Sequence, residues 1–195
     1  MYILAAGAVP VFSAVRLRAE VDMPTNPHAA VTAVYTGMFD PVHFGHLDII
    51  TRTAQLFPRL VIGVGINPEK QAFFTIEERV QVLQELLKDR PHVEVHSFAG
   101  LAVHFVRQVG ATVMVRGLRT VSDMEYEFSM SLTNQTLDPG LQTVFLMSRV
   151  DFTHLSSTLI RQIAAFGGDL QRFLPASIIP WVQAKAQERH HHHRT

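Results

Sequence analysis

The chain has 195 residues, of which 47% are hydrophobic and 17% are charged, and its formal net charge at pH 7 is zero. This balance excludes global disorder, allows one domain with a sizeable core, and gives no electrostatic sign of a nucleic-acid partner. The absence of cysteine excludes disulfides, thiolate metal sites and cysteine nucleophiles. The absence of cysteine is compatible with a reducing cytoplasm, where we expect the protein to act. No run reaches the roughly 18 apolar residues that a membrane-spanning helix needs, so we expect no membrane partner.

Three segments are predicted along the chain. Residues 1–30 contain Pro24, Asn26 and Pro27 without sustained periodicity, which indicates an extension rather than part of the fold. Residues 31–188 are predicted to form one domain. Residues 189–195 are predicted to be a His-rich tail, in which His190–His193 is a solvated run rather than a metal site.

Short apolar runs and helical patterns alternate along the predicted domain. The expected strands are 31–35, 60–66, 93–95, 111–115 and 143–147. The expected helices are 45–57, 76–88 with Thr75 as N-cap, 101–109, 122–137 beginning at a capping box, 156–165 capped by Ser156 or Ser157, and a last one from about 176. This alternation predicts an α/β fold, namely a Rossmann-like, doubly wound, five-stranded parallel sheet with helices on both faces.

The segment from Ala33 to His46 is the most informative part of the sequence. An apolar run breaks at Gly37, a turn delivers His43 and His46, and a helical pattern begins directly afterwards. Free backbone N–H groups and the helix dipole meet at such a junction, which makes it typical of a phosphate site.

Cationic and hydroxyl side chains follow the other predicted strands. Lys70 follows the second strand, Arg116 and Arg119 follow the fourth, and a hydroxyl-rich segment at 153–158 follows the fifth. The carboxyl ends of parallel strands meet at one edge, so these groups suit a polyphosphate that is bound by positioning and charge neutralisation. The sequence has neither a GxxxxGK[ST] loop nor a GxGxxG fingerprint.

Four motifs carry a resemblance to a known family. They are the HFGH run at His43–His46, VRGLR at Val115–Arg119, EYE at Glu125–Glu127, and LSSTLIR at Leu155–Arg161. From Ala33 to Lys185 the chain resembles the bacterial phosphopantetheine adenylyltransferases of the HxGH nucleotidyltransferase superfamily. The combination of RGLR and EYE is what favours this family over its siblings.

The resemblance implies that ATP and 4′-phosphopantetheine are converted to dephospho-coenzyme A and pyrophosphate, with Mg²⁺ accompanying ATP. It implies catalytic roles for His46, Lys70 and Arg119, and binding of phosphopantetheine by Met38, Lys70, Ala102 and Arg116, with Leu101 beside Ala102. The residues implied in ATP binding are Met38, Phe39, His46, Gly117, Leu118, Arg119, Glu127, Phe152, Thr153, His154, Leu155, Ser156, Ser157 and Thr158. The resemblance further implies a homohexamer that coenzyme A inhibits.

One position departs from the family pattern. Met38 stands where the family usually has Ser or Thr, and a thioether cannot donate a hydrogen bond. By analogy with oxyanion-hole deletions, the lost donor costs on the order of 10²-fold in rate unless backbone N–H groups replace it. His43 stands where the family often has Thr, and it fits the wider superfamily without a defined role.

Two alternatives remain open from the sequence. The first is a sibling transferase acting on nicotinamide mononucleotide or on a cytidine nucleotide, which shares HxGH and the serine-rich helix start. The second is a binding module for a nucleotide or for coenzyme A that has lost catalysis at Met38.

Overall fold

The computed structural model describes residues 31–66 and 72–192. The predicted extension at 1–30, the loop residue Lys70 and the end of the His-rich tail lie outside these described residues. No helix in the described part of the chain is long and apolar enough to cross a bilayer.

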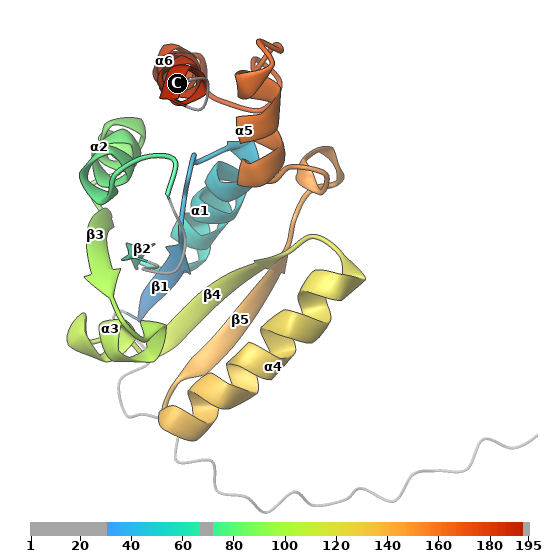
Figure 1. The fold of residues 1–195 in the computed structure, drawn as a ribbon. Helices are drawn as coiled ribbons and strands as arrows, with labels where there is room; N and C mark the ends of the chain where they lie inside the picture. Colours follow the sequence, from blue (N-terminus) through green and yellow to red (C-terminus); the bar gives the residue numbers. More distant parts are fainter. Residues whose placement is uncertain (1–30, 67–71, 193–195) are drawn as a thin grey trace, which may run out of the picture.

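The centre of the fold is a five-stranded, fully parallel sheet in the order β3-β2-β1-β4-β5 (Figure 1). The strands are β1 Thr32–Gly37, β2 Arg59–Ile66, β3 Val93–Ala99, β4 Val113–Leu118 and β5 Gln142–Met147. The chain runs outward from β1 to β3 and then returns to place β4 on the other side of β1. The Rossmann-like prediction is confirmed, and the reversal between β1 and β4 is the place where such sheets bind ligands.

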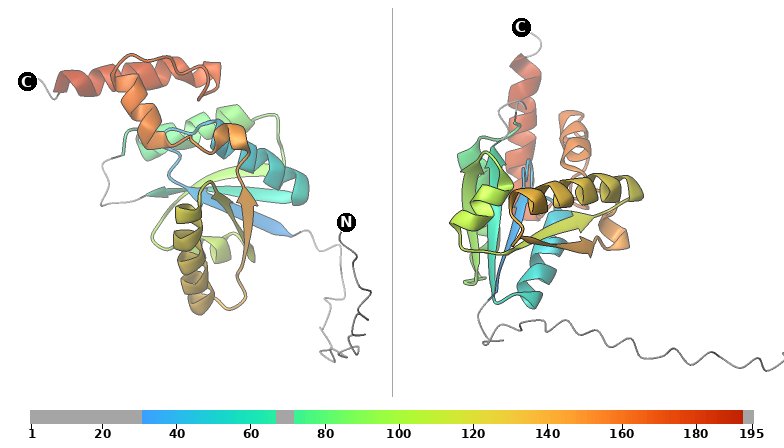
Figure 2. Two further views of the ribbon diagram at one scale, coloured as in Figure 1. Left: turned by 90° about the vertical axis from the view of Figure 1, so that its right-hand side faces the viewer. Right: turned by 90° about the horizontal axis from the view of Figure 1, so that it is seen from below.

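Within residues 31–66 and 72–192, six helices and two short 3₁₀ turns connect and follow the strands. The helices are α1 Phe44–Leu56, α2 Ile76–Leu87, α3 Ala102–Gln108, α4 Val121–Leu137, α5 Ser157–Ala165 and α6 Ile179–His192, and the 3₁₀ turns are η1 Val150–Phe152 and η2 Ala176–Ile178. The pair α5 and α6 pack together beyond one end of the sheet (Figure 2). Helix α6 continues to His192, past the predicted domain limit at 188.

The two faces of the sheet are covered by different helices. Tyr35 of β1 packs in one buried cluster with Ile49 of α1 and Leu83 of α2. The neighbouring Val34 points to the opposite face and packs in a second cluster with Val103 of α3. This alternation along β1 confirms that helices cover both faces, as a buried parallel sheet requires.

Two predicted boundaries near the fourth strand were wrong. Arg116 was expected just after the strand, but β4 pairs with β5 as far as Leu118 opposite Met147, so Arg116 lies within β4. The following helix was expected to begin at a capping box from Ser122. Its N-cap is instead Thr120, whose hydroxyl accepts a hydrogen bond from the backbone N–H of Asp123 at 3.2 Å.

The fourth strand was also predicted to start too early, at 111, whereas β4 begins at Val113. Several other boundaries agree with the prediction or extend it. Thr75 caps α2 in a capping box with Glu78, and Ser156 is the N-cap of α5. Strand β1 continues to Gly37 and β3 to Ala99, since both keep parallel pairing with β2 to those residues.

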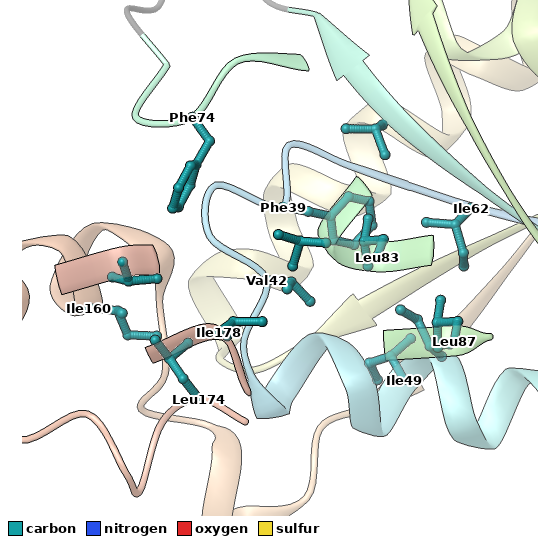
Figure 3. Close-up of a cluster of buried hydrophobic side chains, with 14 of the residues drawn as sticks. Phe39, Val42, Ile49, Ile62, Phe74, Leu83, Leu87, Ile160, Leu174 and Ile178 are labelled. Atoms are coloured by element: carbon teal, nitrogen blue, oxygen red, sulfur yellow. The ribbon is translucent and has the colours of Figure 1, made fainter. Parts of the chain in front are cut away.

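The loop after β1 is anchored in the larger buried cluster. Phe39 and Val42, which are 2% and 1% exposed, point among side chains from the helices and from the segment before α6, including Leu174 and Ile178 (Figure 3). Burial of these apolar side chains fixes the path of the loop, and with it the start of α1.

Candidate active site

A cleft of about 270 Å³ opens at the carboxyl ends of β1 and β4. It lies between the start of α1 and the start of α5, at the reversal of strand order. The lining residues are Tyr35, Thr36, Gly37, His43, Gly45, His46, Ile49, Arg116, Gly117, Arg119, Ser148, Ser156, Ser157 and Thr158. The cleft thus combines guanidinium, imidazole and hydroxyl groups with two helix N-termini, a combination that suits phosphate.

The turn between β1 and α1 is held by close packing. Phe39 has a φ of 50°, a left-handed conformation that is uncommon for an aromatic residue. A Cβ on Gly37 would lie 3.0 Å from the Phe39 ring, so a larger residue there would have to displace the ring. The Asp40 carboxylate accepts hydrogen bonds from the backbone N–H groups of Phe73 and Phe74, at 2.6 and 2.8 Å. These contacts hold a strained turn in the single shape that presents the two histidines.

The geometry defines the protonation state of His46. The backbone N–H of His43 donates to Nδ1 of His46 at 3.3 Å, so Nδ1 is unprotonated and the neutral ring carries its proton on Nε2. Burial, together with the neighbouring His43, Arg119 and Arg116, holds the pKa of His46 well below its usual value. His46 is therefore a neutral N–H donor at physiological pH rather than a cation.

His43 stacks on His46, with ring centroids 3.7 Å apart. Burial, with a contribution from Arg119, lowers the pKa of His43 to about 3. Its Nδ1 is buried and has no hydrogen-bond partner among the described residues. Packing of this neutral ring fixes the plane of His46.

Arg119 links the end of β4 to the start of α5. Its Nη1 donates to the carbonyl of Leu155 at 2.7 Å, and its Nε donates to Asp123 at 2.9 Å. The Ser156 hydroxyl caps α5 by accepting from the backbone N–H of Leu159, while the Ser157 hydroxyl donates to the carbonyl of Pro41 at 2.9 Å. The N-terminus of α5 is thereby fixed beside the turn that carries the histidines.

A second cavity, of about 360 Å³, adjoins the cleft. Its lining comes from α3, α4 and the neighbouring strands, namely Thr36, Phe98, Gly100, Leu101, Ala102, Met114, Arg116, Tyr126, Glu127, Met130, Ser131, Asn134 and Thr143. Thr36 and Arg116 line both spaces. A ligand with a phosphate at Arg116 can therefore extend into either one.

Arg116 is held from two sides. Its Nε and Nη2 donate to both carboxylate oxygens of Glu127, at 2.7 and 2.6 Å. Its Nη1 donates to the carbonyl and the hydroxyl oxygen of Thr36, at 2.8 and 3.1 Å. Burial opposes the charge, but the bonds to Glu127 outweigh it and raise the pKa of Arg116. The guanidinium is a permanently charged, pre-oriented group.

The structure brings only part of the predicted site together. The predicted site residues that line the cleft are His46, Arg116, Gly117, Arg119, Ser156, Ser157 and Thr158. The predicted residues Ala102 and Glu127 line the second cavity. Among the described residues, those that line neither space are Met38, Phe39, Leu118, Phe152, Thr153, His154 and Leu155. Phe39, Leu118 and Leu155 are core residues, at most 3% exposed. Their contacts with substrates, and that of Lys70, stay predictions.

Four residues that line the cleft were not predicted as site residues: Tyr35, Thr36, Ile49 and Ser148. Tyr35 and Thr36 were missed because the first strand was expected to end at Tyr35, which placed the site after Gly37. Ser148 directly follows β5, so the strand-end argument could have found it. Burial raises the pKa of Tyr35 to about 12, which keeps its phenol protonated.

The described residues offer little to a divalent cation. No group of three or more His, Cys, Asp or Glu side chains among them is placed to hold a metal. The described residues lining the cleft include no carboxylate, the ligand that Mg²⁺ prefers in proteins besides phosphate and water. These side chains do not fit a protein-held magnesium site.

Comparison with known proteins places the chain in a family. Residues 34–163 match the sequence profile of the cytidylyltransferase-like family. A phosphopantetheine adenylyltransferase from Caldanaerobacter subterraneus subsp. tengcongensis is 49% identical over 73% of this chain and 89% of its own length. The enzymes of the same name from Clostridium tetani and Bordetella pertussis are 44% and 46% identical, over 80% and 82% of this chain and 98% and 94% of their own lengths.

A solved structure supports the fold alone. A Vibrio parahaemolyticus protein proposed to be a nicotinate-nucleotide adenylyltransferase superposes with a TM-score of 0.58 at 15% identity, covering 77% of this chain and 90% of that one. The three phosphopantetheine adenylyltransferases are far more similar to this chain in sequence, and the matched regions cover nearly the whole length of each enzyme. The chain therefore belongs to the cytidylyltransferase-like family and, within it, to the phosphopantetheine adenylyltransferases.

Proposed function

We propose that this chain transfers the adenylyl group of ATP to 4′-phosphopantetheine, giving dephospho-coenzyme A and pyrophosphate. The observation that carries the proposal is the pair of adjoining spaces that share Thr36 and Arg116. The polar cleft suits the nucleotide phosphates, and the second cavity suits the pantetheine arm. High identity to enzymes of this name supports the choice of substrates.

The reaction needs no protein nucleophile. A phosphate oxygen of phosphopantetheine forms a bond to the α-phosphorus of ATP, and the bond from that phosphorus to the bridging oxygen of the β-phosphate breaks. Pyrophosphate leaves with the electron pair. The attacking phosphate is already ionised at neutral pH, so the principal barrier that the protein can lower is the repulsion between two anions.

The residues of the cleft match this task. Arg116 holds the attacking phosphate, and Arg119 with the N-terminus of α5 neutralises charge on the ATP phosphates. The neutral Nε2–H of His46, at the start of α1, donates to oxygens on which charge develops. Lys70 is proposed to add a further positive charge beside these phosphates.

Magnesium is proposed to arrive as a complex with ATP. The described lining of the cleft has no carboxylate to hold it, so the phosphate oxygens and water would be its ligands. When bound, the ion supplies additional neutralisation of the triphosphate.

A homohexamer is proposed because the family resemblance implies one, and the exposed surface of α4 supports contact between subunits. Asn134 is the only buried residue of this helix, although most of its large side chains are apolar. The exposed apolar residues are Val121, Tyr126, Phe128, Met130, Leu132 and Leu137. An apolar surface of this extent on a soluble protein is typical of a contact between subunits. Sedimentation of the purified protein should give six times the chain mass, and Leu132→Glu should give smaller species.

Coenzyme A is proposed to inhibit the enzyme. It carries the same pantetheine arm as the product, so it would fill the second cavity and exclude phosphopantetheine. Inhibition should be competitive with phosphopantetheine. We further propose that the reaction takes place in the cytoplasm, where ATP and the thiol-bearing substrate are available.

The proposed function is tested by measuring pyrophosphate release. With ATP and Mg²⁺, the expected substrate is phosphopantetheine, and nicotinamide mononucleotide should give no release above background. Preference for the mononucleotide, or for CTP over ATP, would assign the chain to a sibling transferase. Binding of ATP without release of pyrophosphate would indicate a binding module.

A further inference from the structure

Thr36 occupies the boundary between the two spaces. It is the residue before the end of β1, is 6% exposed, and lines both the cleft and the second cavity. A polar side chain this buried, at the meeting point of two proposed substrate sites, needs partners for its hydrogen bonds.

Packing fixes the orientation of this side chain. A Cβ on Gly63 of β2, the register partner of Thr36, would lie 3.1 Å from the Thr36 methyl carbon. The hydroxyl oxygen lies 3.1 Å from Nη1 of Arg116 on β4. The methyl therefore faces β2 and the hydroxyl faces β4.

Arg116 alone cannot surround a phosphate in this arrangement. A guanidinium has five N–H donors, and the bonds to Glu127 and to the two oxygens of Thr36 involve three of its nitrogen atoms. Little of its donor capacity is left for a ligand. A phosphate placed beside Arg116 needs at least one further donor on the protein.

The Thr36 hydroxyl can supply that further donor. Its oxygen accepts from Arg116, so its own proton is free to be donated, and no described residue accepts it. The charge of Arg116 polarises the hydroxyl and strengthens any bond that it donates. The side chain of Met38, at the position where the family pattern has a hydroxyl, lines neither space.

We propose that Thr36 is a substrate-binding residue whose hydroxyl donates a hydrogen bond to the phosphate of the phosphopantetheine substrate. This inference rests on the proposed function. In this chain the hydroxyl that contacts the attacking phosphate comes from the end of β1 rather than from the turn after it. Thr36 contributes to recognition of that phosphate and not to binding of ATP.

The test compares Thr36→Val with Thr36→Ser. Valine keeps the shape and the methyl beside Gly63 but removes the hydroxyl, whereas serine keeps the hydroxyl and loses the methyl. Thr32→Val, at the other end of β1, is the matched control for removing a strand hydroxyl. Because a bond to a charged group is lost, the KM for phosphopantetheine should rise at least about 5-fold in Thr36→Val. The KM for ATP should stay unchanged, and Thr36→Ser should resemble the wild type.

A second measurement separates contact with the phosphate from general disturbance of the pocket. Pantetheine lacks the phosphate, so its inhibition constant should be the same for Thr36→Val and the wild type. A smaller rise in KM for phosphopantetheine, equal losses in the serine and valine variants, or weaker inhibition by pantetheine would each overturn the proposal. If the valine variant does not fold, Thr36→Ala is judged by the same outcomes.

A failure of this inference can be told apart from a failure of the proposed function. The proposed function fails when the wild-type protein releases no pyrophosphate with phosphopantetheine. The role of Thr36 fails when the wild type is active and the hydroxyl makes no difference.

Discussion

The cleft and the second cavity share two residues but are built in different ways. The cleft is formed by strand ends and helix N-termini, which bring imidazole, guanidinium and hydroxyl groups together. The second cavity lies under α4 and beside α3, and most of its lining is apolar or neutral. Its only described charges are Arg116 and Glu127, which neutralise each other through a bidentate ion pair.

This difference divides the work of the site. Apart from the shared Arg116, the cationic and imidazole groups that can act on developing charge line the cleft. The second cavity provides shape and apolar contact, which contribute to binding of an uncharged arm in the ground state. Changes to residues that line only the cleft should therefore lower kcat, whereas changes to the second cavity, including the shared Thr36, should raise the KM for phosphopantetheine.

His46→Ala is expected to have the largest effect. It removes the neutral Nε2–H donor at the start of α1, and loss of one such donor lowers kcat by about 10²- to 10³-fold. Steady-state pyrophosphate release measures this loss, and the KM for phosphopantetheine should change little.

The matched control is His92→Ala, which removes an exposed imidazole before β3 and should keep wild-type rates. If His46→Ala is folded and equally active, the cleft does not act through this imidazole and the division of work is wrong.

Lowering the pH should destabilise the folded protein through His43, which lines the cleft. His43 has a folded pKa of about 3 against a usual value of 6.5. Below pH 6.5 the unfolded chain therefore binds a proton that the folded chain does not. Stability is fully present above that pH and falls as the pH drops towards 3, by about 1.4 kcal/mol per pH unit for this group.

Urea unfolding between pH 7 and pH 5 measures this slope while most carboxylates remain ionised. His43→Thr removes the imidazole and should make the slope shallower. An unchanged slope would mean that the His43 ring already reaches solvent and protonates in the folded protein.

Ala102→Met should affect the second cavity alone. Ala102 begins α3 and faces the space assigned to the pantetheine arm. Filling that space should raise the KM for phosphopantetheine by about 10-fold, by analogy with overpacked cores. The KM for ATP should not change.

Ala165→Met, on the exposed end of α5, adds the same side chain away from both spaces and serves as the control. An increase in the KM for ATP in the Ala102 variant would place the nucleotide in the second cavity and reverse the assignment.

The parts of this site that could be predicted from the sequence are those formed by residues close to one another in the chain. The strand, turn and helix from Ala33 to His46 could be predicted because hydrophobic periodicity and helix starts involve neighbouring residues. The extension of β4 through Arg116 could not, since it depends on pairing with β5 across the α4 crossover. The same holds for the pairing of Arg116 with Glu127, which joins a strand to a helix that packs on it. Thr36 was missed for a related reason, because its importance comes from Arg116 on the adjacent strand.

Met38→Thr is expected to have the smallest effect and gives the sharpest test of where the hydroxyl is needed. The Met38 side chain lines neither space, and its carbonyl is held by Nη1 of the buried Arg79 at 2.8 Å. A threonine there should therefore change kcat by less than about 3-fold, far below the effect of a donor that contacts the reacting phosphates. A gain of about 10-fold or more would show that the turn after β1, and not its last residues, is where this chain lacks a donor. Pyrophosphate release by Met38→Thr and Thr36→Val, measured side by side, decides between these two positions.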